Sequence, residues 1–135
     1  KILTNFIKDM SSETPDVQSY LFVKENISKY NLNINITSKP LKNRMIEVST
    51  ILKFEDKNLN EKKSNFEIVY ISIIKIDESV KDKKELEKIV ICDLQNKIYP
   101  KIEKIFLNLL DLSGFPGVKI EKKIDFNKLY NERIN

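Results

Sequence analysis

The sequence predicts an α+β fold: a four-stranded antiparallel sheet, then a long kinked helix and a short C-terminal helix, both packed on one face. Residues 30–37, 45–54 and 65–76 carry apolar side chains at every second position, which is typical of β-strands. From residue 82 onward, apolar side chains recur instead at every third or fourth position, which is typical of an amphipathic helix. Because the strands precede the helices, the class is α+β rather than alternating α/β.

A further strand with looser alternation occupies residues 3–10, which brings the expected sheet to four strands. The strand at 30–37 is ended by Lys39-Pro40, and the polar segment 55–63 separates the last two strands. Connections this short imply antiparallel pairing. A chain of 135 residues is expected to form one domain, residues 1–135.

The predicted long helix is marked by one stripe of apolar side chains, namely Leu86, Ile89, Val90, Leu94, Ile98, Ile102, Ile105, Phe106, Leu109 and Leu110. Pro100 lies inside this stripe and is expected to kink the helix or to begin a second one. Asp125 can cap a short final helix that runs from residue 126 to about residue 134.

The segment Ser113-Gly114-Phe115-Pro116-Gly117 ends the long helix and contains both glycines of the protein. A chain with only two glycines places them where the backbone needs unusual angles. We therefore expect a defined turn here, with Phe115 held near the surface.

The composition excludes several kinds of chemistry. There is no histidine, the only cysteine is Cys92, and no glycine-rich phosphate loop is present, so we expect no enzyme, no metal and no cofactor. The net charge of +4 is mild, and with only two arginines it does not favour nucleic acid as a partner. A single cysteine and the absence of a signal peptide or long apolar run predict a cytosolic protein that does not insert into a membrane.

The strand at 65–76 is apolar on both faces, whereas a simple two-layer sheet exposes one face to water. A second subunit could cover the additional face. Phe66, Ile68 and Tyr70 are the candidates for subunit contact, and ordinary packing beneath the helices is the alternative.

Several motifs resemble the SecB family of protein-export chaperones. Residues 7–15, Ile-Lys-Asp-Met-Ser-Ser-Glu-Thr-Pro, resemble the family's first strand and its exit, K-D-(I/L)-S-x-E-x-P. Residues 113–130 resemble its last part, a G-x-F-P-like turn, a short apolar segment and a helix opened by N-F-D-x-L-Y/F, although Asp125 and Asn127 are swapped. Cys92 with Tyr99-Pro100 is similar to the family's C-P-x-x-x-F-P, with a gap longer by two residues. The resemblance spans most of the chain.

The resemblance implies a homotetramer, a dimer of dimers, that holds unfolded precursor proteins without ATP and delivers them to the SecA motor. It also implies that acidic residues meet the basic zinc-bearing tail of SecA, and Asp9, Glu13 and Glu67 match them. A leucine that assists these acids is Asn65 here, and this chain is basic whereas family members are usually acidic.

Holding unfolded chains requires accessible apolar side chains. The candidates are aromatic: Phe22, Tyr20 and Phe115 at loop positions, and Tyr99 near the helix kink. Three alternatives to the export chaperone stay open at this point: a SecB-like chaperone dedicated to a toxin–antitoxin client, a mildly basic nucleic-acid-binding module, and a small enzyme.

Overall fold

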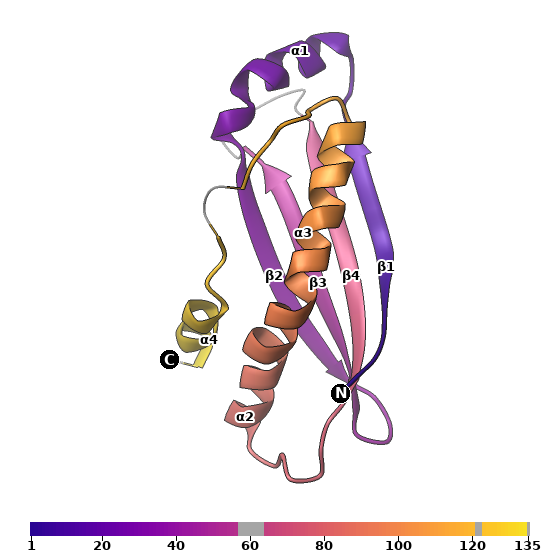
Figure 1. The fold of residues 1–135 in the computed structure, drawn as a ribbon, viewed down its shortest axis with the longest axis vertical. Coiled ribbons are helices and arrows are strands. Elements are labelled where there is room, and N and C mark those ends of the chain that lie inside the picture. Colours follow the sequence, from indigo (N-terminus) through magenta and orange to yellow (C-terminus); the bar gives the residue numbers. More distant parts are fainter. Residues whose placement is uncertain (57–63, 121–122, 135) are drawn as a thin grey trace.

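The computed structural model describes residues 1–56, 64–120 and 123–134. Its centre is a four-stranded antiparallel sheet with the strand order β1-β4-β3-β2 (Figure 1). The strands are β1 (Ile2–Glu13), β2 (Asn31–Pro40), β3 (Met45–Glu55) and β4 (Asn65–Lys75). Each predicted strand overlaps an observed one, so the predicted sheet is confirmed, with β1 and β2 as its two edges.

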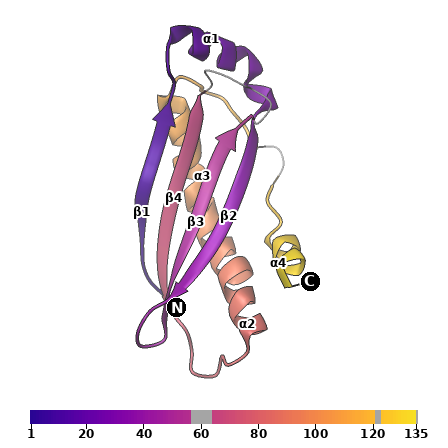
Figure 2. The ribbon, with the colours of Figure 1, turned by 180° about the vertical axis from the view of Figure 1, so that it is seen from behind.

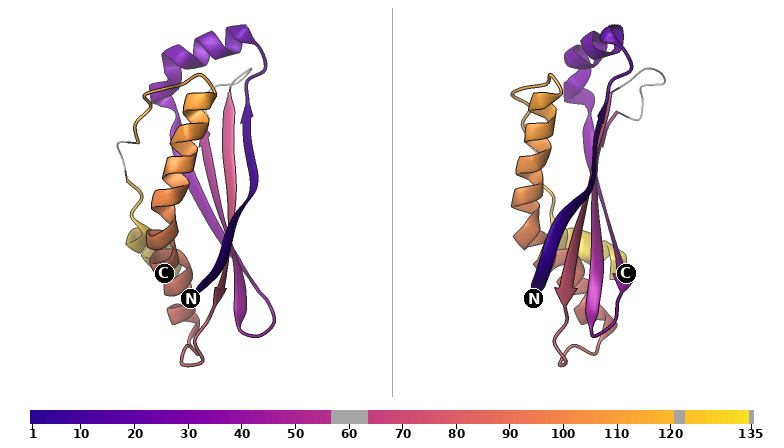
Figure 3. Two further views of the ribbon diagram at one scale, coloured as in Figure 1. Left: turned by 45° about the vertical axis from the view of Figure 1, so that its right-hand side comes forward. Right: turned by 90° about the vertical axis from the view of Figure 1, so that its right-hand side faces the viewer.

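One helical segment crosses one face of the sheet, as Figures 1 and 3 show. It consists of α2 (Lys83–Lys88), a π-helical turn η2 (Ile89–Asp93) and α3 (Leu94–Leu112), with Pro100 inside α3. Figure 2 shows the opposite face, which none of the described helices crosses. We call these the covered face and the open face. No helix in the described part of the chain is long and apolar enough to span a membrane.

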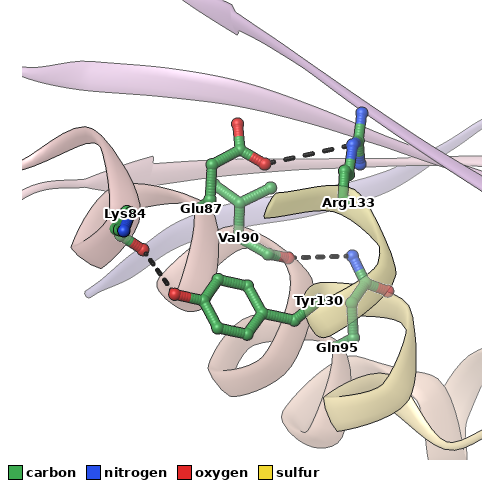
Figure 4. Close-up of polar contacts among 6 residues, drawn as sticks. All are labelled: Lys84, Glu87, Val90, Gln95, Tyr130 and Arg133. Atoms are coloured by element: carbon green, nitrogen blue, oxygen red, sulfur yellow. Dashed lines mark hydrogen bonds and ion pairs between the residues drawn. The ribbon is translucent and has the colours of Figure 1, made fainter. Parts of the chain in front are cut away.

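The last element is α4 (Phe126–Ile134), the short C-terminal helix that the sequence predicted. Asp125 caps it, since its Oδ1 accepts a hydrogen bond from the Lys128 amide at 3.2 Å. Two polar contacts hold α4 beside α2 (Figure 4): the Tyr130 hydroxyl donates to the Lys84 carbonyl at 3.3 Å, and Arg133 lies 3.9 Å from Glu87.

Sequence reasoning missed the helix between the first two strands. α1 (Val17–Asn26) and the 3₁₀ turn η1 (Ile27–Lys29) occupy this connection, so Tyr20 and Phe22 lie on a helix and not in a loop. Asp16 caps α1 by accepting a hydrogen bond from the Ser19 amide at 2.7 Å. Only Ser19 and Val23 of α1 are buried, so this helix lacks the apolar stripe by which α3 was recognised.

The hydrophobic core lies between α3 and the covered face. Its centre is aromatic: the ring of Phe54 lies 5.2 Å from that of Phe106 on α3, 5.2 Å from Tyr30 and 6.1 Å from Phe66, measured between ring centroids. These separations are in the range at which aromatic pairs attract each other. The core therefore fixes α3 to the middle of the sheet.

A buried polar pair also joins the helix to the sheet. The Gln95 side chain donates to the Thr50 hydroxyl at 3.0 Å, and both residues are fully buried. The same amide donates to the Val90 carbonyl at 3.3 Å (Figure 4), which lies at the π-helical turn, where the regular helical ladder is interrupted. This amide thus satisfies polar groups that burial would otherwise leave unpaired.

Candidate functional site

The turn after α3 has the geometry that its glycines predicted. Gly114 and Gly117 have φ of 92° and 78°, in the left-handed region that glycine tolerates best. The amide of Phe115 donates to the Leu110 carbonyl at 2.9 Å and that of Gly114 to the Asp111 carbonyl at 3.2 Å, which together make a Schellman motif.

Phe115 itself is not at the surface, which corrects the expectation from sequence: its side chain is only 3% exposed. Its ring packs edge-on against Phe66, with centroids 5.6 Å apart, and against Tyr20 on α1 at 5.1 Å. The turn directs Phe115 inward, because the Schellman motif places this residue over the end of its own helix.

Tyr20 joins α1 to this turn. Its hydroxyl donates to the Gly114 carbonyl at 2.6 Å, and its side chain is half-buried. A Cβ atom added at Gly114 would lie 2.7 Å from Tyr20 Cε1, so the helix and the turn fit closely. Tyr20 and Phe115 therefore form a support for α1 rather than an open surface.

α1 and the C-terminus of α3 lie at the same end of the molecule (Figure 1), and both carry exposed apolar side chains. Phe22, a predicted candidate, is 48% exposed. Sequence reasoning missed three further exposed residues: Val17 and Leu21, which share one helical face at a spacing of four, and Leu112 at the end of α3. We call these four residues the apical surface.

A groove of about 480 Å³ lies along α3, against the segment that leads into α4. We call it the C-terminal groove, and its lining comprises Asn96, Tyr99, Pro100, Glu103, Lys104, Leu107, Lys123, Ile124 and Phe126. The rings of Tyr99 and Phe126 meet edge-on with centroids 5.4 Å apart. A groove with apolar walls and a few polar groups is typical of a ligand site.

Tyr99, another predicted candidate, is nearly buried in the wall of this groove. Burial, together with the charge of Glu103, raises the pKa of Tyr99 to about 12, so the hydroxyl stays protonated at neutral pH. Among the described residues this buried hydroxyl has no hydrogen-bond partner. A buried polar atom usually has one, so this hydroxyl is an exception, and its burial keeps it out of direct reach of a ligand.

The three predicted acidic residues share the open face. Glu67 lies opposite Ser11 in the pairing of β4 with β1, between Asp9 and Glu13. Residues two apart on a strand point to the same side, and Glu67 alternates with side chains that face α3. On its other side, Glu67 is opposite Lys53 of β3, so the structure brings the three acids together beside a basic neighbour.

Strand β1 is a long edge strand with apolar side chains left exposed, namely Leu3, Phe6, Ile7 and Met10. They lie on both faces, because Phe6 is opposite Ile71, whereas Ile7 is opposite Tyr70. An uncovered edge of this length and composition pairs readily with another strand.

The candidates for subunit contact lie elsewhere than expected. Phe66, Ile68 and Tyr70 are each 2% exposed or less and belong to the core beneath α3 of the same chain. The covered face is thus occupied by the chain's own helix, and the alternative reading, packing beneath the helices, describes their position. The open face and the two sheet edges, β1 and β2, are left uncovered by the described helices that pack on the covered face.

Cys92 lies in the π-helical turn and is buried. Its thiol donates to the Phe126 carbonyl at 3.3 Å and to Asn127 Oδ1 at 3.1 Å, which ties the start of α4 to η2. Burial raises the pKa of this thiol, which makes it less reactive. The described residues contain no cluster of metal-ligating side chains.

Comparison with known proteins gives a consistent result. The family model for preprotein translocase subunit SecB matches residues 1–135. A Pelagibacter ubique protein named "Putative protein-export protein SecB" is 63% identical over 135 residues, which cover all of this chain and 96% of that protein. Protein-export protein SecB of Bartonella quintana is 24% identical over 98% of this chain and 82% of its own length.

Among solved structures, the chain resembles the SecB-like chaperone of Mycobacterium tuberculosis in complex with a peptide from the HigA1 antitoxin. The TM-score is 0.63 and the identity 12%, over 92% of this chain and 87% of the other. This likeness shows that the two share a fold.

The match to the family model, together with the shared fold, defines the class of protein as an α+β chaperone. The chain belongs to the SecB family of protein-export chaperones, because the family model covers its whole length and a relative with 63% identity matches throughout. The resemblance seen in the sequence motifs is thereby confirmed. The family is one of chaperones and not of enzymes.

Proposed function

We propose that this chain is an ATP-independent holdase, which binds unfolded precursor proteins in the cytosol and delivers them to SecA for export. The main support is the accessible apolar area of the apical surface and the C-terminal groove. Monomeric soluble proteins rarely leave such area uncovered unless it binds a partner. Binding of this kind needs no cofactor.

The energetics favour weak and unselective binding at each site. A client that buries about 800 Å² of apolar surface gains on the order of 20 kcal/mol. Association and ordering oppose this by ~4–15 kcal/mol or more. Affinity at one protomer is therefore moderate, and several linked sites hold a client more firmly by raising its effective concentration.

The four predicted client-binding residues have two roles in this proposal. Phe22 contacts the client directly, since it is exposed, and Tyr99 forms part of the wall of the C-terminal groove. Tyr20 and Phe115 support α1 from below. Val17 and Leu21 join Phe22 as direct contacts.

Assembly into a homotetramer, a dimer of dimers, is part of the proposal. The long β1 edge with its exposed apolar side chains supports it, because pairing with a second copy would cover that edge. Native mass measurement should find a particle of about four times 15.9 kDa. A monodisperse monomer at micromolar concentration would contradict this part.

Delivery to SecA is supported by the position of Asp9, Glu13 and Glu67 on one face. We expect the triple variant Asp9→Asn/Glu13→Gln/Glu67→Gln to bind the zinc-bearing tail of SecA several-fold more weakly, with holding of clients unchanged. Lys53, which lies opposite Glu67, should repel the basic tail of SecA. We therefore expect the Lys53→Gln variant to bind SecA more strongly than the unmodified chain does. Equal binding by all three would rule out this surface.

The holdase is tested by light scattering during aggregation of chemically denatured clients, without nucleotide. We expect the chain to delay aggregation and the variant Leu21→Ser/Phe22→Ser to lose most of this effect. Gln18→Ser/Glu25→Ser, which alters exposed polar positions of the same helix, is the matched control and should retain it. No delay by the unmodified chain would refute the proposal, and holding of a single client among several would favour a dedicated chaperone.

A further inference from the structure

A second cavity lies at the opposite end of the sheet from α1, between the β2–β3 hairpin and the segment that joins β4 to α2. Its volume is about 400 Å³, within the range of small-ligand sites. It shares no lining residue with the C-terminal groove. We call it the hairpin pocket.

Arg44 builds one wall of this pocket. Its guanidinium donates to three main-chain carbonyls of the opposite wall, those of Ile76 at 3.2 Å, Asp77 at 2.6 Å and Val80 at 2.9 Å. The Ile76 amide donates in turn to the Arg44 carbonyl at 2.9 Å. These bonds fix the two walls relative to each other, so the pocket is preformed by the fold.

The pocket combines an apolar floor with a basic rim. The floor consists of Leu41, Met45, Ile46, Ile76, Val80 and Leu86. The rim carries Arg44, Lys81 and Lys83 together with Asp82, whose carboxylate accepts a hydrogen bond from the Lys84 amide at 3.0 Å, and a second acid, Asp77, lies beside Arg44. Within the described residues, neither Lys81 nor Lys83 forms an ion pair. Such a site favours an apolar group that carries a negative charge beside it.

We propose that the hairpin pocket is a second client-binding site, which takes a large apolar side chain flanked by Asp or Glu in an extended polypeptide. This inference rests on the proposed holdase function and names a class of client segment for it. Charge complementarity selects the flanking residue: Lys81 and Lys83, which pair with no acid in the part of the chain that the structure describes, attract a carboxylate and repel a client lysine. The net charge of +4 over the whole chain acts in the same direction.

The test uses two fluorescent peptides that are identical except that Glu or Lys flanks a central Leu-Phe pair. We expect the unmodified chain to bind the Glu peptide more tightly, with a preference that shrinks at high salt. Reversal of the rim charge in Lys81→Glu/Lys83→Glu should weaken binding of the Glu peptide about tenfold, since two attractive surface charges become repulsive. The control Lys97→Glu/Lys128→Glu makes the same change in net charge at exposed positions outside both cavities and should change affinity less than twofold.

A third variant, Leu41→Asn, tests the floor and should weaken both peptides equally. The inference is overturned if Lys81→Glu/Lys83→Glu and its control change the peptide affinity equally. It is also overturned if a fatty acid binds in the hairpin pocket without displacing the peptide, because the peptide would then bind elsewhere. Aggregation assays separate the two levels of the account. If the unmodified chain delays no aggregation, the holdase proposal fails. If it delays aggregation but Lys81→Glu/Lys83→Glu leaves the preference for the Glu peptide unchanged, only the proposal for the hairpin pocket fails.

Discussion

Strand β4 is apolar on both sides, but its two sides differ in how completely they are buried. On the covered face, the side chains of Phe66, Ile68 and Tyr70 are buried in the core beneath α3. On the open face Val69 and Ile73 are only half-buried, and no described helix covers them (Figure 2). Both sides look alike in the sequence, but the covered side is buried throughout, whereas the open side is buried at Ile71 and only half-buried at its neighbours Val69 and Ile73. The open side remains available to a second chain.

The same contrast between packed and open positions applies to the rest of the molecule. Packed positions determine whether the chain folds, and open positions determine what it binds. Substitutions matched in chemistry but different in their packing or bonding should therefore differ in how much they lower the free energy of unfolding. Three such pairs follow, from the largest expected effect to the smallest.

The first pair is Ile68→Ala and Ile73→Ala, two isoleucines of β4 on opposite faces. Ile68 is fully buried, so its truncation leaves a cavity and should lower the free energy of unfolding by about 4 kcal/mol. Ile73 is half-buried, and its truncation should lower it by about 1 kcal/mol. Urea denaturation measures both values. Equal losses would mean that the open face is as tightly packed as the covered one.

The second pair is Gly114→Ala and Gly117→Ala, the two glycines of one turn. Both have positive φ, so each alanine strains the backbone by ~1 kcal/mol. At Gly114 the new Cβ also meets Tyr20 at 2.7 Å, whereas at Gly117 nothing lies within 4 Å. We expect Gly114→Ala to cost about 2 kcal/mol more in a thermal unfolding series and to loosen α1, with faster amide exchange in residues 17–26. Similar losses of stability for both variants would contradict the close packing of α1 against this turn.

The third pair is Tyr30→Phe and Tyr99→Phe. The Tyr30 hydroxyl donates to the Ser64 carbonyl at 2.7 Å, so its loss should cost about 1 kcal/mol at pH 7. The Tyr99 hydroxyl has no partner among the described residues, so its loss should cost almost nothing or even stabilise the protein. A large cost at Tyr99 would show that its hydroxyl is already bonded.

The same two tyrosines predict the behaviour in alkali. Burial is the main cause that raises their pKa values from 10.0 to about 12. Between these values the unfolded chain has lost protons that the folded chain retains, so stability is complete below pH 10 and falls as pH rises toward 12. Each Phe variant should show a shallower fall over this window. Curves parallel to that of the unmodified protein would contradict the burial of these phenols.

Much of the fold could be predicted because its patterns are long. The alternation in β2, β3 and β4 and the stripe of α3 each extend over eight or more residues, and each reflects a buried side. α1 could not be predicted in the same way, because it buries only Ser19 and Val23 and is held by its Asp16 cap and by Tyr20. Its signal, an aspartate three residues before Ser19, is a short one.

The candidate site was predicted only in part, for a physical reason. Sequence identifies which residues are apolar, but tertiary packing decides which of them remain exposed. Phe115 and Tyr99 were predicted to be accessible but are buried. Val17, Leu21 and Leu112 were not predicted but are exposed. The three acids on the open face could be matched by motif, yet Lys53 beside Glu67 is visible only through the register of β3 with β4.

The central claim is that accessible apolar side chains grip unfolded polypeptide without chemical turnover. It is tested most directly by photo-crosslinking from a benzophenone side chain at position 22, with position 97 on the exposed side of α3 as control and no nucleotide present. We predict strong crosslinks from position 22 to a denatured client, weak ones from position 97, and none from either to the same client once it has folded. Equal crosslinking from both positions, or none to the denatured client, would contradict the account.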